Sequence, residues 1–76
     1  MKPLSGLRSG GSGTVVRIAS REPDRVVRLS SLGVIPGVRI TLLQRRPAVV
    51  LRVAETSIAL DPEVADEILV EPSPTG

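Results

Sequence analysis

Acidic side chains near the end of the chain are the clearest candidates for chemistry. Four of them fall close together, at Asp61, Glu63, Asp66 and Glu67. Carboxylates of this kind could hold Mg²⁺ or Ca²⁺ weakly, but they bind transition metals poorly without softer ligands. The same stretch also fits a helix start, because Asp61 suits an N-cap and Pro62 suits the first helical position. We therefore expect a short helix with a solvated acidic face, and no metal site.

The composition excludes the common catalytic pairs. The 76 residues include no Cys and no His, so disulfides, thiol nucleophiles, zinc sites and Ser–His pairs cannot form. The serines have no activating base beside them in the pattern, and the single lysine, Lys2, is close to the terminus. Catalysis otherwise needs a tuned acid–base pair or a metal. We predict that the protein is not an enzyme and uses no cofactor.

The charges are divided unevenly along the chain. Residues 1–52 contain all ten basic groups and two acids, whereas residues 53–76 contain six acids and no base, so that the net charge is +2. Pairing between the two halves would explain this division, and a basic face for an acidic partner is the alternative. Nucleic acid is the other candidate partner, because arginines contact phosphates. The chain has no aromatic residue on which bases could stack, so nucleic acid is not expected.

A helix over residues 25–32 must position the first part of the core. Leu29 and Leu32 share one face of this helix, and Asp24 fits its N-cap. Gly33 follows where a helix ends with a left-handed residue, a conformation that only glycine adopts without a steric penalty. The sequence therefore predicts a defined end of the helix at Gly33.

A turn and a strand follow this helix directly. Residues 35–38 place Pro36 second and Gly37 third, as a type II turn requires. The pattern then changes to the alternation of a half-buried strand. The inward positions of that strand are Val38, Ile40 and Leu42.

Short aliphatic strands account for most of the remaining chain. We expect strands over residues 14–19, 48–54, 57–60 and 68–70, and an opening turn in which Leu4 and Leu7 fill the core. With one or two short helices they predict a mainly β, partly open small barrel of about five strands over residues 1–71, and a flexible tail over residues 72–76. The residues expected inside this barrel are Leu7, Val16, Ile18, Leu29, Leu32, Ile40, Leu42, Leu51, Val53, Ile58, Leu60, Ile68 and Val70.

Three aliphatic side chains are left over from the expected core. Val34 and Ile35 lie between two glycines in a connection too short to bury both, and Leu43 follows the inward Leu42. Arginines around them would give an apolar centre with a charged rim, which is typical of protein interfaces. The alternative is that Ile35 or Leu43 packs under the terminal segments. The partner-binding residues that we expect are Val34, Ile35, Leu43, Arg28, Arg39, Arg45 and Arg46.

Residues 29–40 also resemble a family signature. The pattern Leu-x-x-Leu-Gly-x-x-Pro-Gly, from Leu29 to Gly37, is similar to that of the FeoA family. The opening Leu4-x-x-Leu7 and the ending over residues 57–70 look like the same family, so the likeness covers residues 3–71. One departure is the short loop over residues 44–49, where many family members carry a Gly-Asp-Pro segment.

The resemblance implies a small accessory protein of bacterial ferrous iron uptake with a Src-homology-3-like barrel. It would act without catalysis by docking on FeoB, the membrane transporter with a cytoplasmic G-protein domain. The same module occurs in iron-dependent repressors, but a chain that begins at Met1 without a helix-turn-helix favours the free-standing form. A nucleic-acid-binding or repressor-associated module is therefore the alternative function, and weak self-association stays open. With neither a leader pattern nor a membrane-spanning run, we expect a soluble cytoplasmic protein.

Overall fold

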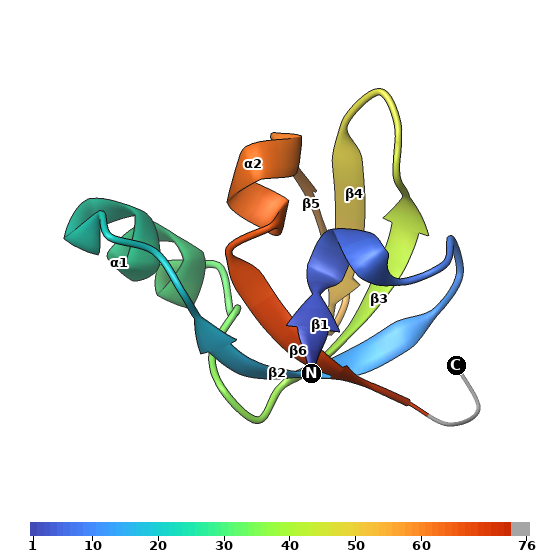
Figure 1. Ribbon diagram of the computed structural model, residues 1–76, viewed down its shortest axis with the longest axis horizontal. Coiled ribbons are helices and arrows are strands. Elements are labelled where there is room, and N and C mark those ends of the chain that lie inside the picture. Colours follow the sequence, from blue (N-terminus) through green and yellow to red (C-terminus); the bar gives the residue numbers. More distant parts are fainter. Residues whose placement is uncertain (74–76) are drawn as a thin grey trace.

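A single antiparallel sheet of six strands curves around an aliphatic core (Figure 1). The computed structural model describes residues 1–73. Three short helices connect the strands: the 3₁₀ helix η1 (Leu4–Gly6), α1 (Pro23–Ser31) and α2 (Pro62–Ala65). The strands are β1 (Lys2–Pro3), β2 (Ser12–Ile18), β3 (Arg39–Gln44), β4 (Val49–Val53), β5 (Thr56–Leu60) and β6 (Ile68–Pro72).

The order of the strands leaves the barrel open. Within the sheet they run β1-β6-β2-β3-β4-β5, so β1 and β5 form its two edges. This arrangement confirms the mainly β, partly open barrel, to which β1 adds a strand that the sequence did not predict. Helix α1 stands away from the sheet, whereas η1 and α2 lie over its concave side (Figure 1).

The prediction of which side chains of β2 face the core is wrong at one position. The alternation predicts Val16 inside, yet Val16 is exposed and Val15 is buried. The pairing of β2 with β6 shifts between Val15 and Arg17, which makes Val16 the extra residue of a β-bulge. Because the bulge interrupts the alternation, Val15 and the partly buried Ile18 both contribute to the core.

Helix α1 differs from the prediction at its start. Its N-cap is Glu22, and Pro23 occupies the first helical position, where a missing N–H costs nothing. Asp24 therefore lies inside the first turn and not at the N-cap. There its carboxylate still complements the positive end of the helix.

The end of α1 buries Val34 in place of Leu32. The N–H of Val34 donates to the carbonyl of Leu29 (3.0 Å) and the N–H of Gly33 to that of Ser30 (3.0 Å). With Gly33 at φ +97°, these bonds form a Schellman motif, in which the residue after the glycine packs back onto the last helical turn. Val34 is accordingly fully buried while Leu32 is 41% exposed. The expectations that Val34 is exposed and that Leu32 is buried are both wrong for this reason.

The type II turn before β3 is confirmed. Gly37 has φ +92°, and the N–H of Val38 donates to the carbonyl of Ile35 (3.2 Å). The turn is also fastened to β2, because Gly37 donates to the carbonyl of Val15 and Val15 donates to that of Val38, each over 2.8 Å. The direction in which β3 leaves the turn is therefore fixed.

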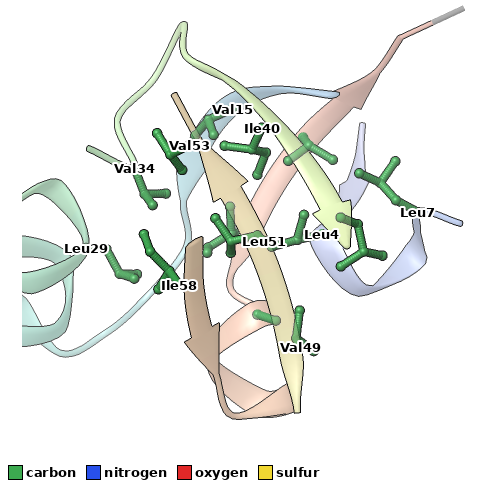
Figure 2. Packing of buried hydrophobic residues seen from close by; sticks show 14 residues of the cluster. Leu4, Leu7, Val15, Leu29, Val34, Ile40, Val49, Leu51, Val53 and Ile58 are labelled. Carbon is green, nitrogen blue, oxygen red and sulfur yellow. The ribbon is translucent and has the colours of Figure 1, made fainter. Parts of the chain in front are cut away.

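The core is built only of aliphatic side chains. Leu4 of η1 and Leu7, the C-cap of that helix, enter it from one end, and Leu29 of α1 meets Ile58 of β5 at the other (Figure 2). The expected core is otherwise confirmed, with Leu60 only partly buried. The buried cluster comprises Leu4, Leu7, Val15, Leu29, Val34, Ile40, Leu42, Val49, Leu51, Val53, Ile58, Ala65, Ile68 and Val70.

The C-terminal strand continues to the start of the expected tail. Pro72 belongs to β6, and the N–H of Ser73 donates to the carbonyl of Ser12 over 2.9 Å. The rest of that tail, residues 74–76, lies outside the described residues. No helix within residues 1–73 is long and apolar enough to cross a membrane.

Alanine substitutions at the glycines should separate backbone strain from crowding. Gly33→Ala should lower the free energy of unfolding by about 2–3 kcal/mol, because a left-handed alanine is strained and its Cβ would lie 3.3 Å from Cγ1 of Val53. Gly37→Ala meets no neighbour within 4 Å and should cost about 1–2 kcal/mol from backbone strain alone. Gly6→Ala is the control, since its Cβ would meet only the flexible Lys2 side chain. Urea unfolding should rank the three in this order, and an equal cost at Gly6 would contradict the explanation.

Candidate partner-binding site

Leu43 and two arginines lie together at the end of the β3–β4 hairpin. Leu43 is 42% exposed, because the pairing of β3 with β4 shifts between Leu42 and Gln44 and leaves it as the extra residue. It lines a shallow hollow with Arg45 and Arg46. We call Leu43, Arg45 and Arg46 the hairpin-tip surface. The predicted exposure of Leu43 is confirmed.

Two further arginines lie on the outer face of the same strands. Arg39 and Thr41 are two residues apart on β3, and Thr41 is opposite Arg52 of β4, so all three side chains project away from the core. Residues 39–53 contain these two arginines and the two of the hairpin tip, but no acid. This side of the sheet is therefore basic.

Ile35 and Arg28 do not join the hairpin-tip surface. Ile35 is exposed as expected, but it lies in the turn before β3, beyond the opposite end of that strand from Leu43. Arg28 lies on α1 and lines a different hollow, between that helix and β5. The structure thus divides the predicted set of residues into separate surfaces.

Charge pairing between the two halves of the chain is limited. The ion pairs within residues 1–73 join Arg25 to Glu22 and to Glu67, and the terminal amine to Glu71. None of the arginines of β3, β4 and their loop takes part in them. The basic side of the sheet consequently keeps its charge available for a partner.

Arg25 fastens α1 to the connection between α2 and β6. Its Nη1 donates to Oε1 of Glu67 (2.7 Å), and its Nη2 lies 3.0 Å from Oε2 of Glu22. The hydrogen bond to Glu67, supported by the charge of Glu22, raises the pKa of Arg25 above its ordinary value. Leu29 is the only fully buried residue of α1. The ion pair and this one apolar anchor therefore hold the helix in place.

A groove separates α1 from β5. Leu29 and Ile58 form its floor, and the partly exposed Leu32 and Leu60 form its walls. Its volume is about 490 Å³. Sequence reasoning missed this groove, because neither the edge position of β5 nor the exposure of Leu32 follows from local pattern. The only sequence signal was an amphipathic helix with more apolar residues than one short contact can bury.

The acidic residues around α2 do not assemble into a metal site. Within the described part of the chain, no three His, Cys, Asp or Glu side chains are grouped so that they could hold an ion. Two of the candidate carboxylates have other partners, since Ser5 Oγ donates to Asp66 and Arg25 donates to Glu67. Asp61 is the N-cap of α2, as expected.

The architecture is that of a small Src-homology-3-like domain with short added helices. The chain belongs to the FeoA domain family, whose model matches residues 2–72. The family consists of non-enzymatic accessory proteins of ferrous iron transport. The resemblance seen in residues 29–40 is thereby confirmed. Among curated proteins no sequence matches the chain.

Solved structures of the family share the fold closely. A crystal structure of the iron uptake regulatory protein FeoA has a TM-score of 0.85 at 26% identity, over 95% of this chain and 96% of that one. FeoA from Chlorobium tepidum, determined in solution, has a TM-score of 0.85 at 27% identity, over 95% of this chain and 70% of that one. A zinc complex of FeoA from Stenotrophomonas maltophilia, described as a prokaryotic SH3 domain protein, shares the fold at 22% identity and a TM-score of 0.82, over 93% and 91% of the two chains.

The same fold occurs as part of a longer regulator. A manganese-dependent transcriptional repressor has a TM-score of 0.86 at 25% identity, over 95% of this chain but only 41% of that one. The fold by itself therefore serves both transport proteins and repressors.

Removing the Arg25 ion pair should loosen α1 without unfolding the barrel. In Arg25→Gln we expect faster amide hydrogen exchange throughout α1 and unchanged exchange in β3 and β4, because only the helix loses an attachment. Arg28→Gln is the matched control, since Arg28 lies on the same helix outside the ion pairs of the described residues. Equal exchange in both variants would show that Leu29 alone holds the helix.

The isolated protein should not bind ferrous iron tightly. Carboxylates without nitrogen or sulfur ligands compete poorly with water for transition metals, and the chain has no His or Cys. Anaerobic calorimetry with Fe²⁺ should detect no saturable binding at submicromolar metal. A submicromolar dissociation constant would overturn this prediction.

Proposed function

We propose that the protein is an accessory protein of ferrous iron uptake that docks on the cytoplasmic part of a FeoB-type transporter. The observation that carries the proposal is the match of the FeoA domain model to residues 2–72. The S. maltophilia protein of the same fold is described as a candidate activating factor of ferrous iron transport, which supports a regulatory role. Such a partner places the protein in the cytoplasm.

The hairpin-tip surface is the docking site that the geometry supports best. Leu43 supplies an exposed apolar centre, and Arg45 and Arg46 supply a charged rim that can pair with acids of a partner. Arg39 and Arg52 extend the basic area along the strands. An interface of this composition associates quickly at low salt and more slowly when salt screens the arginines.

Docking alone is sufficient for regulation. A protein without catalytic groups changes the activity of a transporter only by binding one of its states more tightly than another. The difference between the two affinities then sets how far the nucleotide cycle or the assembly of the transporter is shifted. This mechanism requires no iron on the accessory protein itself.

A module associated with a transcriptional repressor is the second candidate function. The specific observation in its favour is the repressor whose fold matches 95% of this chain. Arginines outside the ion pairs of the described residues would serve phosphate contacts in that case. The lack of aromatic side chains argues against recognition of single-stranded nucleic acid.

Charge and polarity changes at the hairpin tip should weaken docking. Leu43→Asp, and separately the double change of Arg45 and Arg46 to Glu, should weaken binding to the purified cytoplasmic domain of a FeoB-type transporter about tenfold or more, because each removes part of the interface centre or rim. Ile35→Asp is the matched control, with equal exposure at the far end of β3. Calorimetry measures the affinities, and thermal unfolding checks that each variant folds.

One outcome would contradict the proposed docking site, and another would contradict the proposed function. Equal losses in Leu43→Asp and Ile35→Asp would mean that the hairpin tip is not the docking site. Binding of the unaltered protein to oligonucleotides, with a shallower salt dependence after the Arg45 and Arg46 changes, would favour the repressor-associated function.

A further inference from the structure

The groove between α1 and β5 combines a free sheet edge with an apolar channel. We propose that an extended segment of a partner protein binds there as an added strand along β5, with alternate apolar side chains in the groove and a basic residue beside Asp24 and Asp61. This site is separate from the hairpin-tip surface and does not depend on the identity of the transporter.

The backbone of β5 offers hydrogen bonds to such a segment. The loop between β4 and β5 has two residues, and Val53 lies opposite Thr56. Starting from Thr56, every second residue of β5 therefore forms its backbone hydrogen bonds with β4. Ser57 and Ala59 therefore direct their N–H and C=O groups away from β4. Among residues 1–73 no other backbone or side-chain group bonds to them. An exposed edge of this kind accepts an additional strand from another chain.

The other side of the groove supplies apolar surface for the side chains of an added strand. Leu29 of α1 approaches Ile58 of β5 at the base of the groove (Figure 2). Above that base, Leu32, Leu60 and Val64 each keep part of their surface exposed. Side chains of a strand point alternately to its two faces, so every second residue of the bound segment would enter the groove. A volume of about 490 Å³ lies within the range of specific ligand pockets.

The charged residues that line the groove favour a basic residue at one end of the bound partner segment. Arg25 is occupied by its contacts with Glu22 and Glu67. Asp24 and Asp61 also line the groove, and neither belongs to an ion pair of the described residues. Arg28 lines the groove as well, so that three acids (Glu22, Asp24 and Asp61) stand against two arginines. The net negative charge that remains attracts a Lys or Arg of the partner. A helical partner could meet the apolar walls, but its backbone could not bond to Ser57 and Ala59.

A short synthetic strand is the direct probe of this site. The peptide KTVTVT, acetylated and amidated, carries its basic first residue and both valines on one face of the strand. Its binding can be followed by calorimetry and by the amide signals of Ser57 and Ala59. We expect saturable binding with shifts at both amides. Leu32→Asp should weaken it about tenfold or more because one wall becomes charged. Val27→Asp is the matched control, because Val27 lies on α1, whose C-cap is Leu32, and is 63% exposed and outside the groove. It should leave the affinity unchanged.

Methylated peptides test the backbone pairing without altering the protein. N-methylation of the first, third and fifth amides blocks one edge of the peptide, and methylation of the second, fourth and sixth blocks the other. One of the two peptides should lose its binding by about tenfold or more and the other should keep it, because only one edge faces β5. The Leu43→Asp variant should bind the unmodified peptide as tightly as the unaltered protein does. A failure of this proposal can therefore be distinguished from a failure of the proposed docking at the hairpin-tip surface.

Each of the following results would overturn the proposal. The first is absence of saturable binding at millimolar peptide. The second is equal loss in Leu32→Asp and Val27→Asp, and the third is equal affinity of the two methylated peptides. The fourth is a helical signal from the bound peptide, or a dimer of the protein that forms through the groove and excludes the peptide.

Discussion

The left-handed conformation of Gly33 is the constraint on which the rest of the structure depends. It lets the Schellman bonds close, and these bonds carry Val34 into the core and end α1 at a fixed place. The type II turn at Gly37 follows at once and delivers β3 to the centre of the sheet. Because Gly33 also packs near Val53, the same residue sets how closely the end of the helix approaches β4.

The parts of the fold that rest on local chemistry were predictable from the sequence. The glycine after the helix, the Pro-Gly turn and the alternation of Ile40 and Leu42 each follow from backbone conformation over a few residues. The bulge at Val16 was not predictable, because it depends on the register of β2 against β6, which are distant in the sequence. The burial of Val34 in place of Leu32 was likewise not predictable, because it depends on the geometry of the Schellman motif.

The candidate site was predictable only in its composition. The exposure of Leu43 was predicted from the sequence and is confirmed, and the excess of arginine over residues 39–53 is a property of the sequence itself. Which residues lie together depends on strand length and on the strand order, so the separation of Ile35 from Leu43 could not be derived. The same order leaves β5 at an edge beside α1. It creates a second surface, of which the sequence indicates only the amphipathic helix and not the strand beside it.

The wholly aliphatic core has an optical consequence. A chain without Trp, Tyr or Phe has almost no absorbance in the near ultraviolet and no intrinsic fluorescence. In a mixture with a partner that contains Trp or Tyr, every change in emission therefore arises from the partner alone. The protein can be titrated as a transparent ligand, and the environment of the partner's rings can be followed without any label.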